Sequence, residues 1–378
     1  AMATGITKIA DGRTVYYNDE GQMAYGWQEV NGQRYYFRPT NGDMIHGQLQ
    51  YNGHWYYLND QTGAMATGIT KIADGRTVYY NNDGQMQYGS QTINGHNYYF
   101  ATTNGDMVKG LFFDKKNRTF QYYGPNGRRV HGNVSIDGTN YNFDEVNDSL
   151  QLNERNQQLH LGGHWYWVGN DGKIATGLTK LTDGRTVYYD PNNAQMVYGE
   201  LLLNGHWHFF DYNDGNEYVN AFANLRDGRT AYYDNNGNMS YGEKLITGHW
   251  YHFNENNGAM SKGFTTLKDR RLVYYDKLGH MVYGWKNLNG HQYYFNNNDG
   301  DLDLNTTLIN AWRSVINNYS NPISIAIQAQ RTGQVYSYTN RPGHHWRMAS
   351  TVKVSVLAQL LHSTGGNLNG YQQQLATN

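Results

Sequence analysis

The sequence predicts an all-β fold, a β-hairpin solenoid of about 14 repeats, followed by an incomplete α+β domain. Three observations support this prediction: a motif that recurs about every 21 residues, Asn-Gly or Asp-Gly dipeptides at a fixed place in most repeats, and a composition with 35 Tyr and 44 Gly among 378 residues. Because aliphatic residues are few, we expect many small aromatic cores along the chain in place of one thick core.

The repeat is visible in the letters themselves. The segment TGITKIADGRTVYY occupies residues 4–17 and recurs without change at residues 67–80. Residues 142–160 form the least regular stretch. We assign residues 1–304 to the repeat array and residues 305–378 to a second, partial domain. The expected repeats begin at Gly5, Gly26, Gly47, Gly68, Gly89, Gly110, Gly132, near Asn153, and at Gly177, Gly199, Ala221, Gly242, Gly263 and Gly284.

Each repeat reads as a strand, a short turn, a second strand with Tyr-Tyr or Trp-Tyr, and another turn that contains Gly. Asn-Gly and Asp-Gly are the dipeptides that favour the positive φ angles of a type I′ hairpin turn. An isolated hairpin is only marginally stable in water, so successive hairpins are expected to stack and bury one another's aromatic faces.

The composition excludes several classes of protein. A formal net charge of −1 provides no basic surface for nucleic acid, and cysteine is absent. No apolar run approaches the roughly 18 residues of a membrane span. The histidines of the Gly-His-Trp segments lack metal-ligand spacing, so we predict no metal and no cofactor. The chain begins inside a repeat, and we expect an export signal upstream of it.

Two segments carry a resemblance to a known family. Gly26-Trp27 followed by Tyr35-Tyr36-Phe37, and GHWYY at residues 53–57 followed by Gly63-Ala64-Met65, resemble the cell-wall-binding repeats of the choline-binding and glucan-binding families. The resemblance implies a secreted protein on a Gram-positive cell surface. Its partner would be an α-glucan or other cell-surface polysaccharide, or a choline-decorated wall polymer.

Choline recognition requires an aromatic cage around a quaternary ammonium group. Arg34 stands where one cage Trp of the choline-binding family would be, and only a cage from Trp27, Tyr35 and Trp55 is left as an alternative. The DGRTVYY strands resemble glucan-binding repeats more closely, because sugars stack on Tyr and Trp. The alternative to sugar binding is a purely structural role, in which many of the tyrosines pack in the core and the turn arginines form salt bridges with their own turns. The predicted glycan-binding residues are Tyr25, Trp27, Trp55, Tyr88, Tyr198, Trp207, Tyr241, Trp250, Tyr283 and Trp285.

The pattern changes after Gly300. Apolar residues at helical spacing predict a helix over residues 308–319, with Asn305 or Thr306 as its cap. Strands are predicted at residues 323–329 and 335–339, joined by a Thr-Gly turn. The segment Met-Ala-Ser-Thr-Val-Lys at residues 348–353 then opens an apolar helix, on which Ser350 and Lys353 share one face.

This order of elements, with Ser-x-x-Lys opening a helix, resembles the start of class A β-lactamases and related penicillin-recognising serine hydrolases. The resemblance implies that Ser350 is the acylated nucleophile and Lys353 its activating base. The Ser-Asp-Asn and Lys-Thr/Ser-Gly motifs of that family are absent. We therefore expect a hydrolase parent and an inactive chain, and a non-catalytic glycan-binding adhesin is the alternative.

Overall fold

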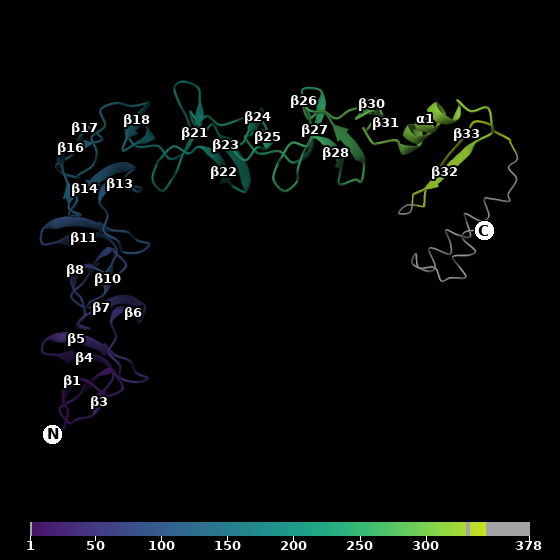
Figure 1. The fold of residues 1–378 in the computed structure, drawn as a ribbon. Coiled ribbons are helices and arrows are strands. Elements are labelled where there is room, and N and C mark those ends of the chain that lie inside the picture. Colours follow the sequence, from purple (N-terminus) through teal and green to yellow (C-terminus); the bar gives the residue numbers. More distant parts are fainter. Residues whose placement is uncertain (1, 330–332, 345–378) are drawn as a thin grey trace, which may run out of the picture. The chain divides into compact units, whose positions relative to one another are not determined.

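The computed structural model describes residues 2–329 and 333–344 (Figure 1). This part of the chain forms two compact units. Unit 1 contains residues up to Ala221 together with Tyr233–Asn238, and unit 2 contains Phe222–Tyr232 and the described residues from Met239 onward. Each unit is described by itself.

Fourteen antiparallel hairpins follow one another along the described chain between Gly5 and Phe295. Short strands β3 (Met23–Ala24), β10 (Met86–Gln87) and β15 (Arg129–Val130) add a third strand to three of them. The hairpins pair β1 (Gly5–Lys8) with β2 (Thr14–Tyr17), β4 (Gly26–Val30) with β5 (Gln33–Phe37), β6 (Gly47–Tyr51) with β7 (His54–Leu58), β8 (Gly68–Lys71) with β9 (Thr77–Tyr80), β11 (Gly89–Ile93) with β12 (His96–Phe100), β13 (Gly110–Asp114) with β14 (Thr119–Tyr123), β16 (Gly132–Ile136) with β17 (Thr139–Phe143), β18 (Gln157–Leu161) with β19 (His164–Val168), β20 (Gly177–Lys180) with β21 (Thr186–Tyr189), β22 (Gly199–Leu203) with β23 (His206–Phe210), β24 (Ala221–Asn224) with β25 (Thr230–Tyr233), β26 (Gly242–Ile246) with β27 (His249–Phe253), β28 (Gly263–Thr266) with β29 (Leu272–Tyr275), and β30 (Gly284–Leu288) with β31 (His291–Phe295).

The predicted all-β, repeat-rich fold is confirmed. Every hairpin except the eighth begins at its predicted residue, and the eighth begins at Gln157, later than the predicted start near Asn153. The delay arises after the preceding turn, which has the ordinary length, since Phe143 bridges Leu150 as Leu58 bridges Met65. The additional residues are 151–156, between Leu150 and β18.

The core consists of small clusters between successive hairpins. In one of them Tyr57 of β7 packs with Val78 and Tyr80 of β9 and with Met86 of β10, and all four are buried. Tyr79, between the two buried residues of β9, is only half-buried. One of each pair of adjacent tyrosines thus points inward, as the alternation of a strand predicts.

Backbone hydrogen bonds also link successive hairpins. The N–H of Met107 donates to the carbonyl of Thr77 in the preceding hairpin at 2.7 Å, and Met281 donates to Trp250 at 2.8 Å. Contacts of this kind join a hairpin mainly to its neighbours, which is the arrangement of a repeat protein.

The Asn-Gly turns have the predicted type I′ geometry, for example Asn52 with φ 48° and Gly53 with φ 80°. The same prediction was wrong for the Asp-Gly-Arg turns, where Gly75 takes a positive φ of 94° and Asp74 does not. The Asp74 carboxylate instead accepts hydrogen bonds from the backbone N–H of Arg76 at 3.1 Å and from its Nε at 2.9 Å. These side-chain bonds close a longer turn.

In many repeats the second turn places Gly against a Met side chain. At Gly105, which has φ +74°, an added Cβ would lie 2.7 Å from Met86 Sδ, whereas at Gly95, with φ +77°, it would meet no atom within 4 Å. Both Gly→Ala substitutions carry a backbone cost of about 1 kcal/mol or more. Gly105→Ala is expected to lower the free energy of unfolding by a further ~1–2 kcal/mol because of the overpacked Met86. Urea unfolding of the two variants measures this difference, and equal losses would contradict it.

After the last hairpin, α1 (Leu304–Ile316) begins at Asp303, whose carboxylate accepts a hydrogen bond from Thr306 N at 2.9 Å. Asp303 is therefore the cap, and the predicted caps Asn305 and Thr306 were wrong because they already lie inside the first turn. Strands β32 (Ser324–Gln328) and β33 (Val335–Thr339) pair as the predicted antiparallel hairpin.

Helix α1 contacts β31 and β33. Thr307 anchors it to the last hairpin of the array, since its Oγ1 accepts a hydrogen bond from Tyr294 N at 2.9 Å. The predicted catalytic residues Ser350 and Lys353 lie outside the described residues. Within those residues, no helix has both the length and the apolar character required to cross a bilayer.

Candidate binding sites

Large aromatic side chains lie exposed along the array. Eight of the ten predicted binding residues are exposed, with fractions of 37–47 %: Tyr25, Trp55, Tyr88, Tyr198, Trp207, Trp250, Tyr283 and Trp285. Trp165 is also exposed and was missed, although it occupies the same Gly-His-Trp position as Trp55. Core packing does not explain why so many aromatic side chains are exposed to solvent.

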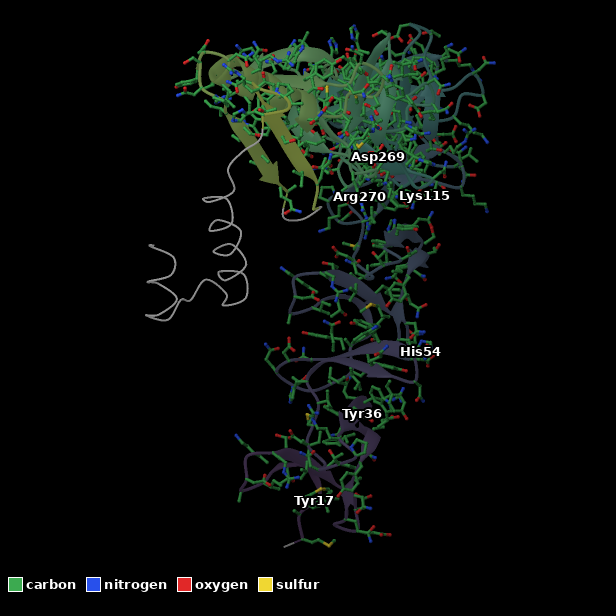
Figure 2. All side chains as sticks on the ribbon, turned by 90° about the vertical axis from the view of Figure 1, so that its right-hand side faces the viewer. Tyr17, Tyr36, His54, Lys115, Asp269 and Arg270 are labelled. Atoms are coloured by element: carbon green, nitrogen blue, oxygen red, sulfur yellow. The ribbon has the colours of Figure 1, made fainter. Side chains whose placement is uncertain are left out.

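In unit 2, a shallow cavity of about 240 Å³ brings several of these groups together. It is assembled from three successive hairpins and the turns that follow them. Its lining consists of Trp250, Met281 and Tyr283 with the polar residues Glu243, Asp269, Arg271, Asn298 and Asp299. Asp269 is labelled in its turn in Figure 2.

The backbone explains why Trp250 and Tyr283 share this cavity. Met281 donates its N–H to the carbonyl of Trp250, so the segment after β29 is fixed beside the Trp. Tyr283 lies two residues beyond Met281, and in extended chain residues two apart point to the same side. Gly300 leaves room for Met281, because a Cβ at that position would clash with Met281 Sδ.

Arg271 holds the three hairpins in register around the cavity. Its Nε pairs with Asp269 of its own turn at 2.7 Å, and its Nη2 pairs with Glu243 at 2.5 Å, while Nη1 donates to the carbonyl of Asp299. The hydrogen bond from Arg271 lowers the pKa of Asp269 below its ordinary value, so this pair is charged at neutral pH.

A buried tyrosine hydroxyl lies close to the same groups. Tyr275 is fully buried, and its hydroxyl has no hydrogen-bond partner among the described residues. Burial, with the nearby Glu243 carboxylate, raises the pKa of Tyr275, and the Arg271 guanidinium opposes this effect. A buried hydroxyl without a partner costs about 1–3 kcal/mol, and Tyr275 lies behind the cavity lining, not in it.

Unit 1 contains the same arrangement twice. In the first copy Arg76 pairs with Asp74 and donates to the Gln48 side chain at 3.2 Å and to the carbonyl of Asn104. Gln48 takes the place of Glu243 there. The first copy consists of Gln48, Trp55, Asp74, Arg76, Met86, Tyr88 and the buried Tyr80, and the second of Gln158, Trp165, Asp183, Arg185, Met196, Tyr198 and the buried Tyr189.

We call each set a Trp–Tyr site. Every site needs one hairpin with Gly-His-Trp followed by one whose turn reads Asp-x-Arg, where x is Gly or, in unit 2, Arg270. This order recurs a fourth time in the sequence at Trp207, Arg229 and Tyr241. Tyr241 is half-buried. The turn arginines of all these repeats pair with their own aspartates, as the structural interpretation of the sequence expected.

Trp27 has different surroundings. Its ring packs against Tyr36 at 5.1 Å and Tyr56 at 5.0 Å between centroids, and the Arg34 guanidinium lies 4.9 Å from its ring centroid. Trp27 is thus engaged by its own hairpin and the next one. Trp285 contacts Tyr294 at 5.2 Å and stays exposed, and the Tyr25 ring lies 3.4 Å from where a Cβ on Gly42 would be.

The chemistry of the sites is that of ring stacking and hydrogen bonding. Within residues 2–329 and 333–344, no three His, Asp or Glu side chains are grouped in a way that would hold a metal ion. Trp and Tyr offer apolar faces, and the carboxylate, amide, guanidinium and hydroxyl groups beside them offer donors and acceptors in a small volume.

Family models match most of the array. A choline-binding repeat matches residues 3–48, 24–68, 66–112, 175–222 and 225–264, and a putative cell wall binding repeat matches residues 284–302. Among curated proteins, glucosyltransferase-I of Streptococcus downei is 32 % identical over 77 residues, which are 20 % of this chain and 5 % of that protein. The chain thus spans only a small part of that relative.

Similar solved structures include choline binding protein F from Streptococcus pneumoniae, 19 % identical, with 80 % of this chain and 99 % of that chain covered and a TM-score of 0.28. Alternansucrase in complex with isomaltononaose is 20 % identical, with 71 % of this chain and 22 % of that chain covered and a TM-score of 0.26.

Proposed function

The chain belongs to the family of choline-binding repeats, whose model matches more than half of its residues, and we propose that it binds a glycan at the bacterial cell surface. The Trp–Tyr sites are the binding elements in this proposal. A location outside the cell, in contact with a Gram-positive wall, agrees with a family of cell-wall-binding repeats.

The observation that carries the proposal is the composition of the Trp–Tyr sites. An exposed Trp and an exposed Tyr lie beside a guanidinium and several carboxylate or amide side chains. A sugar needs an aromatic surface for its C–H face and a set of donors and acceptors for its hydroxyls. The local similarity to a glucosyltransferase supports an α-glucan as that sugar polymer.

A choline-decorated wall polymer is the second candidate, and a specific observation favours it. In unit 2 the Glu243 and Asp269 carboxylates lie beside Trp250 and Tyr283, and negative charge with aromatic faces attracts a quaternary ammonium. Arg271 in the same cavity opposes that attraction, and in unit 1 Gln48 and Gln158 replace the glutamate. The geometry therefore supports α-glucan more than choline.

Chromatography on immobilised dextran separates the two candidates. We expect the chain to be retained, because several weak sites on one chain add through avidity. Isomaltose-type oligosaccharides should elute it, and free choline should not. Elution by choline, or retention on a choline matrix alone, would contradict the α-glucan proposal and assign the sites to a choline-decorated polymer.

We also propose residues 305–378 as the partial β-lactamase-like domain that follows a glycan-binding array of residues 1–304. The order of α1, β32 and β33 agrees with the resemblance that suggested this domain. Ser350 as nucleophile and Lys353 as its activating base belong to the same proposal, and both residues lie outside the described part of the chain.

A further inference from the structure

The middle of unit 1 departs from simple neighbour stacking. Two segments donate backbone hydrogen bonds to the same hairpin, β13–β14. Leu150 N donates to the carbonyl of Phe120 in β14 at 2.7 Å, and Ile174 N donates to the carbonyl of Arg118, just before β14, at 2.9 Å. Hairpin β13–β14 therefore accepts backbone hydrogen bonds from the segments that follow two later hairpins, β16–β17 and β18–β19. Their shared core contains the buried residues Phe113, Phe120, Phe143, Leu150, Leu161, Tyr166, Val168, Ile174 and Ala194.

Beside this three-hairpin junction lies a cavity of about 850 Å³. It is built by elements far apart in sequence, from β12 and β13 to the turn after β21. Tyr99 and Phe112 form an aromatic pair on its wall, with ring centroids 4.3 Å apart. Amide side chains of Asn117, Gln121, Asn147, Asn192 and Asn193 also line it.

The loop between β13 and β14 supplies the basic side chains of this cavity. It holds Lys115 and Lys116, and it replaces the two-residue Asn-Gly turn of other hairpins. The Lys115 ammonium donates to Asn192 Oδ1 at 2.8 Å and so spans the cavity edge (Lys115 is labelled in Figure 2). Asp114, the lining carboxylate, accepts bonds from Lys116 N at 3.0 Å and Asn117 Nδ2 at 2.7 Å within its own loop.

A third cation completes the lining. Arg129 uses Nη2 to pair with Asp148 at 2.6 Å, whereas its Nε is buried and has no hydrogen-bond acceptor among the described residues. Lys115, Lys116 and Arg129 thus place three positive charges around an aromatic wall. The Asp114 carboxylate carries one negative charge there, and its oxygens accept hydrogen bonds from its own loop. Guanidinium and ammonium groups of this kind form strong bonds with phosphate and carboxylate oxygens.

We propose that this cavity binds an acidic sugar, a hexose unit that carries a phosphate or a carboxylate. The anionic group accepts hydrogen bonds from Lys115 and Lys116, and Arg129 adds positive charge beside it. The sugar ring lies against Tyr99 and Phe112, and the amides bind its hydroxyls. This site differs from the Trp–Tyr sites in its residues and in the charge of its ligand. It does not depend on the α-glucan proposal.

Isothermal titration of the full chain with glucose 6-phosphate, glucuronate and glucose tests the proposal. We expect saturable binding of one or both anionic sugars, weakened by added salt, and much weaker binding of glucose. Binding of only one of them identifies phosphate or carboxylate as the recognised group. Equal binding of glucose, or no saturable binding of either anionic sugar, would overturn the proposal.

The variant Lys115→Gln/Lys116→Gln should weaken the anionic sugars on the order of tenfold or more, because two charge-assisted contacts are lost. Lys71→Gln/Lys180→Gln is the matched control, since both lysines are exposed and lie outside the cavity lining. An equal loss of affinity for the anionic sugars in both variants would show that overall charge causes the effect, and would contradict binding in this cavity. Retention on dextran should stay unchanged in both.

Discussion

Replacing Trp55, Trp165, Trp207 and Trp250 together by alanine is expected to abolish retention of the chain on immobilised dextran. Trp55, Trp165 and Trp250 are the exposed rings of the three Trp–Tyr sites, and Trp207 is an exposed ring in the same sequence context. Truncating an aromatic anchor costs about 2 kcal/mol or more at a binding site. Because avidity multiplies the separate sites, losing all four should lower apparent affinity by about 10²–10⁴-fold. A single Trp250→Ala change should have a much smaller effect.

The matched control is Trp285→Ala, which removes an equally exposed Trp outside the Trp–Tyr sites. Retention should be close to that of the unchanged chain, and circular dichroism should show the same strand content in all variants. If the fourfold variant were still retained, sugar stacking would have to occur elsewhere, and the Trp–Tyr sites would be structural.

Replacing Tyr80 and Tyr275 by phenylalanine should weaken neither folding nor binding. Their hydroxyls are buried without a partner among the described residues, so their removal should leave the melting temperature unchanged or raise it. Binding of an isomalto-oligosaccharide should stay unchanged, because both side chains are fully buried and no sugar can reach their hydroxyls. Calorimetry of folding and of binding on the same variants measures both effects.

Tyr123→Phe provides the opposite case. Tyr123 is also buried, but its hydroxyl donates to Gln121 Oε1 at 3.0 Å. This variant should lose about 0.5–1.5 kcal/mol of stability and keep its affinity for the oligosaccharide. A loss of stability in Tyr80→Phe and Tyr275→Phe would show that their hydroxyls are engaged within the fold, and weaker binding would show that a sugar reaches these hydroxyls.

The hairpins were predictable from sequence because their boundaries depend on local backbone conformation. Positive φ angles at glycines such as Gly47 and Gly89 mark the start of successive hairpins, and only a few residues decide each turn. The Asp-Gly turns show the limit of that reasoning. The dipeptide at Asp137-Gly138 forms the predicted type I′ turn, whereas Arg76 two residues after Asp74 recruits the carboxylate into a different turn.

The grouping of side chains was less predictable. The sequence indicated Tyr283 and Trp250 as separate binding residues, and the structure places both in one cavity. Strand alternation tells which side of a hairpin a residue occupies, but the rotation between hairpins depends on long-range bonds such as Met281 to Trp250. The three-hairpin junction depends on similar bonds, so only its irregularity was visible in the sequence.

The order of hairpins in a Trp–Tyr site has a consequence for how such chains change in evolution. Each site takes its Trp from one hairpin and its arginine and Tyr from the next and the segment after it. Recombination that deletes or duplicates two hairpins at a time therefore preserves complete sites and changes only their number. Loss of the single hairpin that carries the arginine leaves a Trp beside a hairpin without one, and the site is lost. The number of binding sites therefore changes when hairpins are gained or lost in pairs.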